Sequence, residues 1–190
     1  MEITFERRFR GPLTSANGGY ACGRIAEYVE AEAVEVTLRL PPPLEGPLVV
    51  RRDGASVRLL DGDAVVAEAR PADVGLEPPR AVSRDEAEAA KERHVRGGNP
   101  EFGECFVCGD RPSRDGLGIR VGAVLGREPL HAAPWTPSEV GYEIVWAAID
   151  CPGAYAVGAE GRGEIGLGRM TARVLRVPDA GESCGVTAWP

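Results

Sequence analysis

The spacing of apolar residues predicts a short helix near the start of the chain, after Ser15-Ala-Asn-Gly-Gly-Tyr20. Beyond this motif, apolar side chains recur at helical intervals: Ala21, Ile25, Tyr28 and Val29. Ser15 or Asn17 can cap the helix. Gly18 and Gly19 then fall in the first turn, where each glycine costs about 1 kcal/mol of helix propensity. Either a close approach by a ligand or another backbone explains these glycines, or they form a plain glycine-rich turn.

After this helix the pattern changes to the alternation that is typical of strands. Residues 34–40 place every second side chain on one apolar face, and three prolines follow. Further strands are predicted at 48–51, 57–60 and 64–67, with a turn at Asp61-Gly62 before the last of them. A helix followed by several antiparallel strands indicates the α+β class.

A proline-rich stretch without periodicity, residues 71–82, is predicted to be a linker. Ser83-Arg-Asp-Glu86 has the pattern of a capping box and opens a polar helix that runs to about His94. Few of its residues are suited to packing, so we interpret it as a surface connector. The predicted organisation is a first half at 1–82, a polar linker helix at 83–100 and a second half at 101–190.

The second half is predicted to repeat the order of helix and then strands. Alternation predicts a strand at 117–121, and residues 144–149 are apolar nearly all round, which predicts a buried helix. Pro152 is expected to end or kink that helix. A loop is expected from Gly161 to Gly168, followed by strands at 170–177 and from Cys184 onward.

The two halves share one short sequence match. Leu38-Arg39-Leu40-Pro41 matches Leu175-Arg176-Val177-Pro178, and each copy follows an apolar helix. Only 12 residues follow Pro178, which is enough for one strand, whereas the first half continues through three. We therefore expect the second half to lack about a hairpin. Either the chain is truncated, or a partner chain or the N-terminal segment covers the open sheet edge.

Composition and charge exclude several classes of function. The net charge is -7 and no stripe of Lys or Arg is present, which argues against a nucleic-acid partner. The N-terminus lacks an apolar signal region, and no apolar run reaches the roughly 18 residues that span a bilayer. We therefore predict a cytoplasmic protein without a membrane partner. Five cysteines, an odd number, indicate reduced thiols.

Asp150 is the outstanding candidate for chemistry. It follows six apolar residues on a helix that is expected to be buried. A buried carboxylate must be partnered, placed in a pocket or neutral, and a raised pKa suits a general base. The alternative is an ordinary aspartate that caps the turn at Cys151-Pro152.

Cys105-x-x-Cys108 is compatible with half of a zinc site or with a redox pair. Zinc needs about four ligands, but the chain has two histidines, His94 and His131, and no second CxxC. We predict no metal and no cofactor, and interpret the pair as small thiols in a tight turn. His94 is expected to be solvated and His131 to pack in a strand.

Three motifs resemble those of a known family. They are Asn17-Gly18-Gly19-Tyr20, then Trp146-Ala-Ala-Ile149-Asp150-Cys-Pro-Gly153, and Cys105-Phe-Val-Cys108-Gly109 with Gly116-Leu117-Gly-Ile119 after it. Over about residues 5–190 the chain resembles the double-hotdog acyl-CoA thioesterases, and in particular thioesterase-like proteins of actinobacterial type. The resemblance implies two hotdog halves, each with an antiparallel sheet that wraps a central helix.

The resemblance also implies a mechanism and partners. Asp150 would activate water or attack the thioester, while Asn17, Gly18, Gly19 and Tyr20 would bind the substrate, with a backbone N–H of Gly19 or Tyr20 holding its carbonyl. The implied partners are an acyl-CoA or related thioester and a second copy of the chain in a dimer. The alternative is a non-catalytic module that binds acyl groups or acyl-CoA. A hotdog hydratase or dehydratase ranks last, because no histidine follows Asp150.

Overall fold

The computed structural model describes residues 1–95, 99–112, 114–158 and 166–190. Most of the predicted loop from Gly161 to Gly168 lies outside these residues. Two antiparallel sheets and three α-helices make up the described chain, together with two short 3-10 helices, η1 (Arg7–Phe9) and η2 (Pro100–Phe102). The predicted α+β class is confirmed. No helix among the described residues has both the length and the apolar character that crossing a membrane requires.

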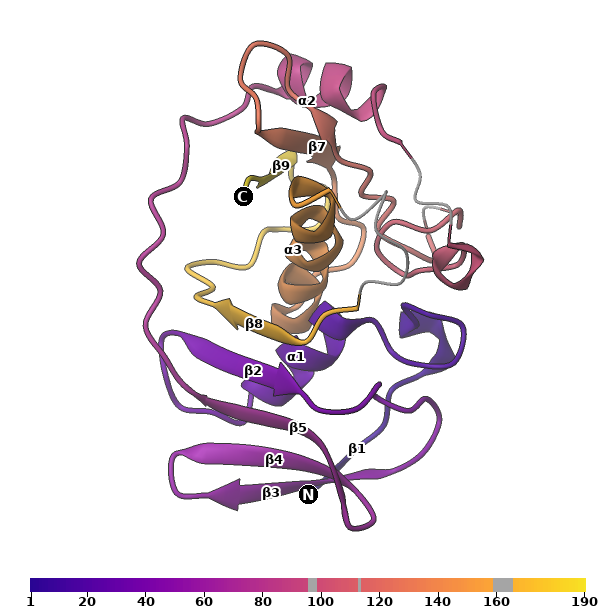
Figure 1. Ribbon diagram of the computed structural model, residues 1–190, viewed down its shortest axis with the longest axis vertical. Coiled ribbons are helices and arrows are strands. Elements are labelled where there is room, and N and C mark those ends of the chain that lie inside the picture. Colours follow the sequence, from indigo (N-terminus) through magenta and orange to yellow (C-terminus); the bar gives the residue numbers. More distant parts are fainter. Residues whose placement is uncertain (96–98, 113, 159–165) are drawn as a thin grey trace.

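The larger sheet has six strands in the order β1-β3-β4-β5-β2-β8 (Figure 1). The strands of the first half, all predicted except the two-residue β1, are β1 (Glu2–Ile3), β2 (Val34–Leu38), β3 (Leu48–Asp53), β4 (Ser56–Asp61) and β5 (Ala64–Pro71). In β2, Val34 and Val36 are fully buried while Glu35 and Thr37 are partly exposed. This one-sided burial is what a sheet with a single covered face requires.

Helix α1 (Gly18–Ala26) lies against the apolar face of this sheet, as a hotdog unit requires. Asn17 caps it, because its side-chain oxygen accepts a hydrogen bond of 2.9 Å from the backbone N–H of Tyr20. Ile25 on the helix and Leu59 on β4 are completely buried in the main core. The expected helix and its N-terminal cap are therefore confirmed.

A strand of the second half extends the sheet of the first half. β8 (Arg169–Ala172) pairs antiparallel with β2, so that Met170 lies opposite Val36. It is shorter than the predicted strand at 170–177, and Leu175 is 84% exposed in an irregular segment. The proposed match of this segment to residues 38–41 as equivalent strands is therefore wrong. The two halves are joined by the pairing of β2 with β8.

A second sheet contains β6 (Gly122–Ala123), β7 (His131–Trp135) and β9 (Cys184–Ala188) in that order. Helix α2 (Arg84–Lys91) covers it, at the top of Figure 1. The capping box is confirmed by reciprocal bonds between Ser83 and Glu86. However, Ala87 and Ala90 are buried against the sheet, so α2 is not a bare surface connector. Alanine side chains are small enough to let the helix approach this closely.

The strand predicted at 117–121 is absent from the structure. Leu117 and Ile119 donate backbone hydrogen bonds to the carbonyls of Phe106 and Val107, so this segment follows an irregular loop. Ile119 and Val121 are nonetheless buried. The alternation of these two apolar residues therefore reflects their burial. The backbone of this segment, however, hydrogen-bonds to the loop that carries Cys105 and Cys108, and not to a strand.

Helix α3 (Tyr142–Ala156) contains the predicted buried segment and continues past it. Pro152 was expected to end or kink the helix. The helix does not end there, because it runs on for another turn. A proline removes the hydrogen bond to the carbonyl four residues earlier, and its ring crowds that carbonyl. Pro152 and Ala156 are both buried, and this packing offsets the lost bond.

Helices α1 and α3 pack at very short range because glycines lie in their contact. A Cβ on Gly19 would come within 2.6 Å of the Asp150 Cβ and of the Trp146 carbonyl oxygen. A Cβ on Gly23 would lie 2.6 Å from the Glu143 Cα. Of the two readings of the glycine-rich helix start, the structure supports a close approach by another helix.

We predict that Gly23→Ala lowers the free energy of unfolding by about 2 kcal/mol, because the added methyl forces the helices apart. Gly153→Ala is the matched control, since Gly153 lies on the exposed side of α3 with open space around its Cα. That change should stabilise the protein by up to about 1 kcal/mol through helix propensity. Urea unfolding measures both, and an unchanged stability for Gly23→Ala would contradict the described packing.

Candidate functional site

Asp150 lies at the contact between the two halves. Its Oδ2 accepts a hydrogen bond of 2.9 Å from the backbone N–H of Gly19 and one of 3.1 Å from the side-chain Nδ2 of Asn17. The carboxylate therefore sits at the N-terminus of α1, where unpaired N–H groups and the helix dipole favour negative charge. The alternative role of Asp150, capping a turn at the end of its own helix, is wrong because α3 continues past it.

Asn17 uses both ends of its side-chain amide. The oxygen caps α1 at Tyr20, and the nitrogen donates to Asp150. The residue is only 2% exposed, so these bonds satisfy a polar group that water does not reach. Asn17 therefore couples the start of α1 to the carboxylate of α3, a role that a capping residue alone would not have.

Burial raises the pKa of Asp150 to about 6, against an ordinary value of 3.8. Loss of hydration is the main cause, and the negative charge of a Cys105 thiolate adds to it. The hydrogen bonds from Gly19 and Asn17 act in the opposite direction, because they favour the ionised form. A carboxyl with such a pKa is able to exchange a proton near neutral pH.

The predicted substrate-binding residues meet Asp150 in different ways. Asn17 and Gly19 contact it directly. A Cβ on Gly18 would come 2.8 Å from the side chain of Leu167, which covers that glycine. Tyr20 is 4% exposed and its ring stacks on Phe9 at a centroid distance of 4.0 Å, so its side chain belongs to the core.

The two backbone donors expected to hold a thioester carbonyl are already engaged. The N–H of Gly19 donates to Asp150, and the N–H of Tyr20 donates to Asn17. The N–H of Gly19 therefore holds the carboxylate, and the N–H of Tyr20 holds the side chain of Asn17. Binding of a thioester carbonyl by these donors stays a prediction.

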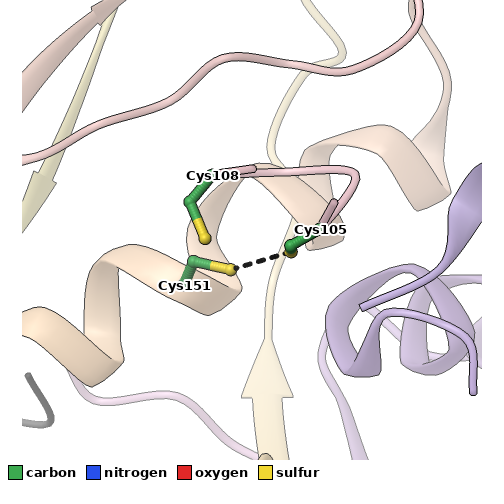
Figure 2. A group of neighbouring side chains, drawn as sticks. All are labelled: Cys105, Cys108 and Cys151. Atoms are coloured by element: carbon green, nitrogen blue, oxygen red, sulfur yellow. Dashed lines mark hydrogen bonds between the residues drawn. The ribbon is translucent and has the colours of Figure 1, made fainter. Parts of the chain in front are cut away.

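A group of three thiols lies next to this carboxylate. Cys151, the residue after Asp150, brings its Sγ within 3.7 Å of the Cys105 Sγ, and Cys108 completes the group (Figure 2). Hydrogen bonds from the thiols of Cys108 and Cys151 hold the pKa of Cys105 well below its ordinary value. The sequence indicated that Cys151 lies beside the site of Asp150, but not that it joins the CxxC pair. Its one signal was that it follows Asp150 on the same apolar helix.

The two histidines lie outside the contact between Asp150 and α1. His131 is part of β7, as predicted. His94 is partly buried, its Nδ1 lies 2.9 Å from the Val121 carbonyl oxygen, and its ring centroid is 4.9 Å from that of Tyr155. The expectation that His94 is solvated is therefore wrong, because the loop before β6 and the end of α3 pack around it.

The carboxylate of Asp150 in the second half thus lies at the helix start of the first half. No family model and no curated protein sequence matches the chain. Among solved structures, the chain is similar to hotdog-fold proteins. One is a conserved protein of unknown function with a hotdog fold from Alicyclobacillus acidocaldarius, with 11% identity and a TM-score of 0.46 over 77% of this chain and 61% of that one.

Two further solved structures are similar at comparable levels. A candidate thioesterase II from Thermobifida fusca has 14% identity and a TM-score of 0.49, over 98% of this chain and 79% of that one. The tesB protein of Mycobacterium avium subspecies paratuberculosis has 14% identity and a TM-score of 0.46, over 93% and 82% of the respective chains. These likenesses concern the fold.

We predict that the stability difference between Asp150→Asn and the wild type grows with pH. The folded-state pKa of Asp150 lies above its unfolded value. The protonated carboxyl therefore contributes stability that is fully present below about pH 4 and is lost as the pH rises through about 6. The asparagine variant does not titrate here, so its relative stability should rise on the order of 2 kcal/mol between pH 4 and 7.

Urea unfolding of both proteins in chelator-containing buffer, at several pH values in this range, measures the effect. Titrating groups that do not interact with Asp150 cancel in the difference because they are common to both proteins. Parallel pH profiles would show that the environment of Asp150 does not raise its pKa.

Proposed function

We propose that the chain handles acyl thioesters, and that it hydrolyses an acyl-CoA or related thioester with water activated by Asp150. The observation that carries the proposal is the Asp150 carboxylate itself, which is partly buried, has a raised pKa and lies at the N-terminus of a helix from the other half. Such a carboxylate suits general base chemistry.

The hydrogen bonds favour different roles for the two oxygens of the Asp150 carboxylate. Both bonds from α1 reach Oδ2. Oδ1 is then the atom that accepts a proton from water, while the resulting hydroxide attacks the thioester carbonyl carbon. As the C–S bond breaks, the proton passes to the leaving thiolate, and Asp150 returns to its ionised form. Asn17 and Gly19 are positioning residues in this scheme, because they act through Asp150.

A second candidate function is a non-catalytic acyl or acyl-CoA binding module. It is favoured by the engagement of the N–H groups of Gly19 and Tyr20 with Asp150 and Asn17. A thioester carbonyl can use Gly19 only if Asp150 releases it, and oxyanion donors contribute strongly to acyl transfer. Self-association as a dimer and a cytoplasmic location remain predictions under either function.

Asp150→Asn should lower the rate of thiol release from acyl-CoAs by about 100-fold or more, because the amide cannot accept the proton of water. Glu143→Gln is the matched control. It changes a partly buried acid of the same helix, two turns earlier, and should leave the rate unchanged. A screen of acyl-CoAs of different chain lengths, with released thiol measured by a chromogenic reagent, tests both variants.

The same screen separates the two functions. Equal thiol release by wild type and a folded Asp150→Asn variant would eliminate the proposed role of Asp150. Thermal stabilisation of the wild type by acyl-CoAs, without any thiol release, would establish the binding module instead.

Substitutions at Asn17 separate the cap from the positioning of Asp150. Asn17→Ala removes the cap, the hydrogen bond to Asp150 and the weak 3.9 Å bond from Nδ2 to the Cys105 Sγ, and should cost about 1 kcal/mol of stability. Asn17→Ser keeps a good capping oxygen but is too short to hold Asp150. We therefore expect Asn17→Ser to retain most of the stability and to lose roughly tenfold or more in kcat with little change in KM. Unfolding curves and steady-state rates on the same preparations test this, and an unchanged kcat in Asn17→Ser would remove the positioning role.

A further inference from the structure

The CxxC turn has a shape that only a glycine permits. The backbone N–H of Gly109 donates to the Cys105 carbonyl at 2.9 Å, which closes the turn. A Cβ on Gly109 would come within 2.4 Å of the backbone nitrogen and oxygen of Cys105. The turn therefore folds back on Cys105 and places the Cys108 sulfur within 4.8 Å of the Cys105 sulfur.

A third sulfur reaches this turn from a distant part of the chain. Cys151 on α3 lies 3.7 Å, sulfur to sulfur, from Cys105, and the sulfurs of Cys105, Cys108 and Cys151 all lie within 4.8 Å of one another. In Figure 2 the three side chains converge between the loop and the helix. Cys105 is 1% exposed, whereas Cys108 and Cys151 are partly exposed as residues.

The spacing of these sulfurs is that of a metal site. Zn–S bonds are about 2.3 Å long, and tetrahedral geometry then places sulfur ligands about 3.8 Å apart. The separation of Cys105 and Cys151 meets this value, and the remaining distances need to close by at most about 1 Å. Three thiolates are soft ligands that select zinc or similar thiophilic cations over magnesium or calcium.

We propose that Cys105, Cys108 and Cys151 form a binding site for a zinc ion. The prediction of no metal relied on ligands that are close in sequence, and the fold supplies a third one 46 positions from Cys105. Among the described residues, no further His, Cys, Asp or Glu joins the group within the same mutual distance. The fourth position is therefore open to water or to an added ligand, as in zinc sites with three protein ligands. This inference does not depend on the proposed function.

A bound ion would tie the 105–109 loop to α3. Binding requires the thiols to lose their protons to solvent, and the binding energy adds to the stability of the folded state. Because Cys151 follows Asp150 on the helix, the ion would also fix the turn of α3 that carries the carboxylate. A disulfide uses two of these sulfurs and gives the third no role, so it is the alternative that the experiment must separate.

The test uses the full chain, purified under reducing conditions and supplied with Zn²⁺ or Co²⁺. We expect one equivalent of metal per chain by elemental analysis after dialysis, together with the intense visible bands and the near-ultraviolet thiolate charge-transfer band of tetrahedral cobalt. Cys105→Ser, Cys108→Ser and Cys151→Ser should each lose the stoichiometric metal and the charge-transfer band. Cys184→Ser is the matched control and should keep both, since Cys184 lies on β9 outside the group.

X-ray absorption at the zinc edge of the wild type provides a measurement that does not require the variants to fold. A shell of three sulfurs with one lighter atom supports the site, and a shell without sulfur overturns it. Failure of the reduced wild type to retain either metal also overturns it. So does retention of the metal by Cys151→Ser, or recovery of a Cys105–Cys151 disulfide by mass spectrometry from protein that was reduced and then loaded with zinc.

Discussion

The close packing of α1 against α3 is the constraint on which the rest of the structure depends. Gly19 and Gly23 contribute no side chain to the contact, so the helices approach until Asp150 lies at hydrogen-bond distance from the start of α1. The helix terminus favours the carboxylate, while loss of water disfavours it. The balance leaves a hydrogen-bonded acid whose pKa is raised to about 6, in a place that belongs to neither half alone.

Two features of the second half make this contact possible. β8 pairs with β2, which joins the second half to the sheet that carries α1. α3 continues through Pro152, so Asp150 and Cys151 are both held in a regular helix. Successive residues of a helix point about 100° apart, and these two side chains therefore reach different partners. Asp150 meets α1, whereas Cys151 meets the loop at Cys105.

The sequence drew attention to the residues that meet at the candidate site, but it did not predict the hydrogen bonds between them. Asp150 was identified because a carboxylate after an apolar run demands an explanation, and Asn17 with Gly19 because caps and costly glycines mark a helix start. The bond from Gly19 to Asp150 was not foreseen, since it joins residues 131 positions apart. The contact of Cys151 with the CxxC pair was not foreseen for the same reason, because the pattern that marks a thiol cluster in sequence needs its members close together.

The amino-acid sequence by itself determined the strands β2 to β5, the two capped helix starts and the burial of α3, because alternation, capping and helical periodicity act between near neighbours along the chain. Only the tertiary structure decided that α2 covers a sheet, that residues 117–121 lie in a loop, and that α3 passes through Pro152. Those outcomes depend on which distant surface each segment packs against. The tertiary structure also decided that Asn17 and Gly19 meet Asp150. This happens where α1, with glycines in place of larger residues, packs against α3.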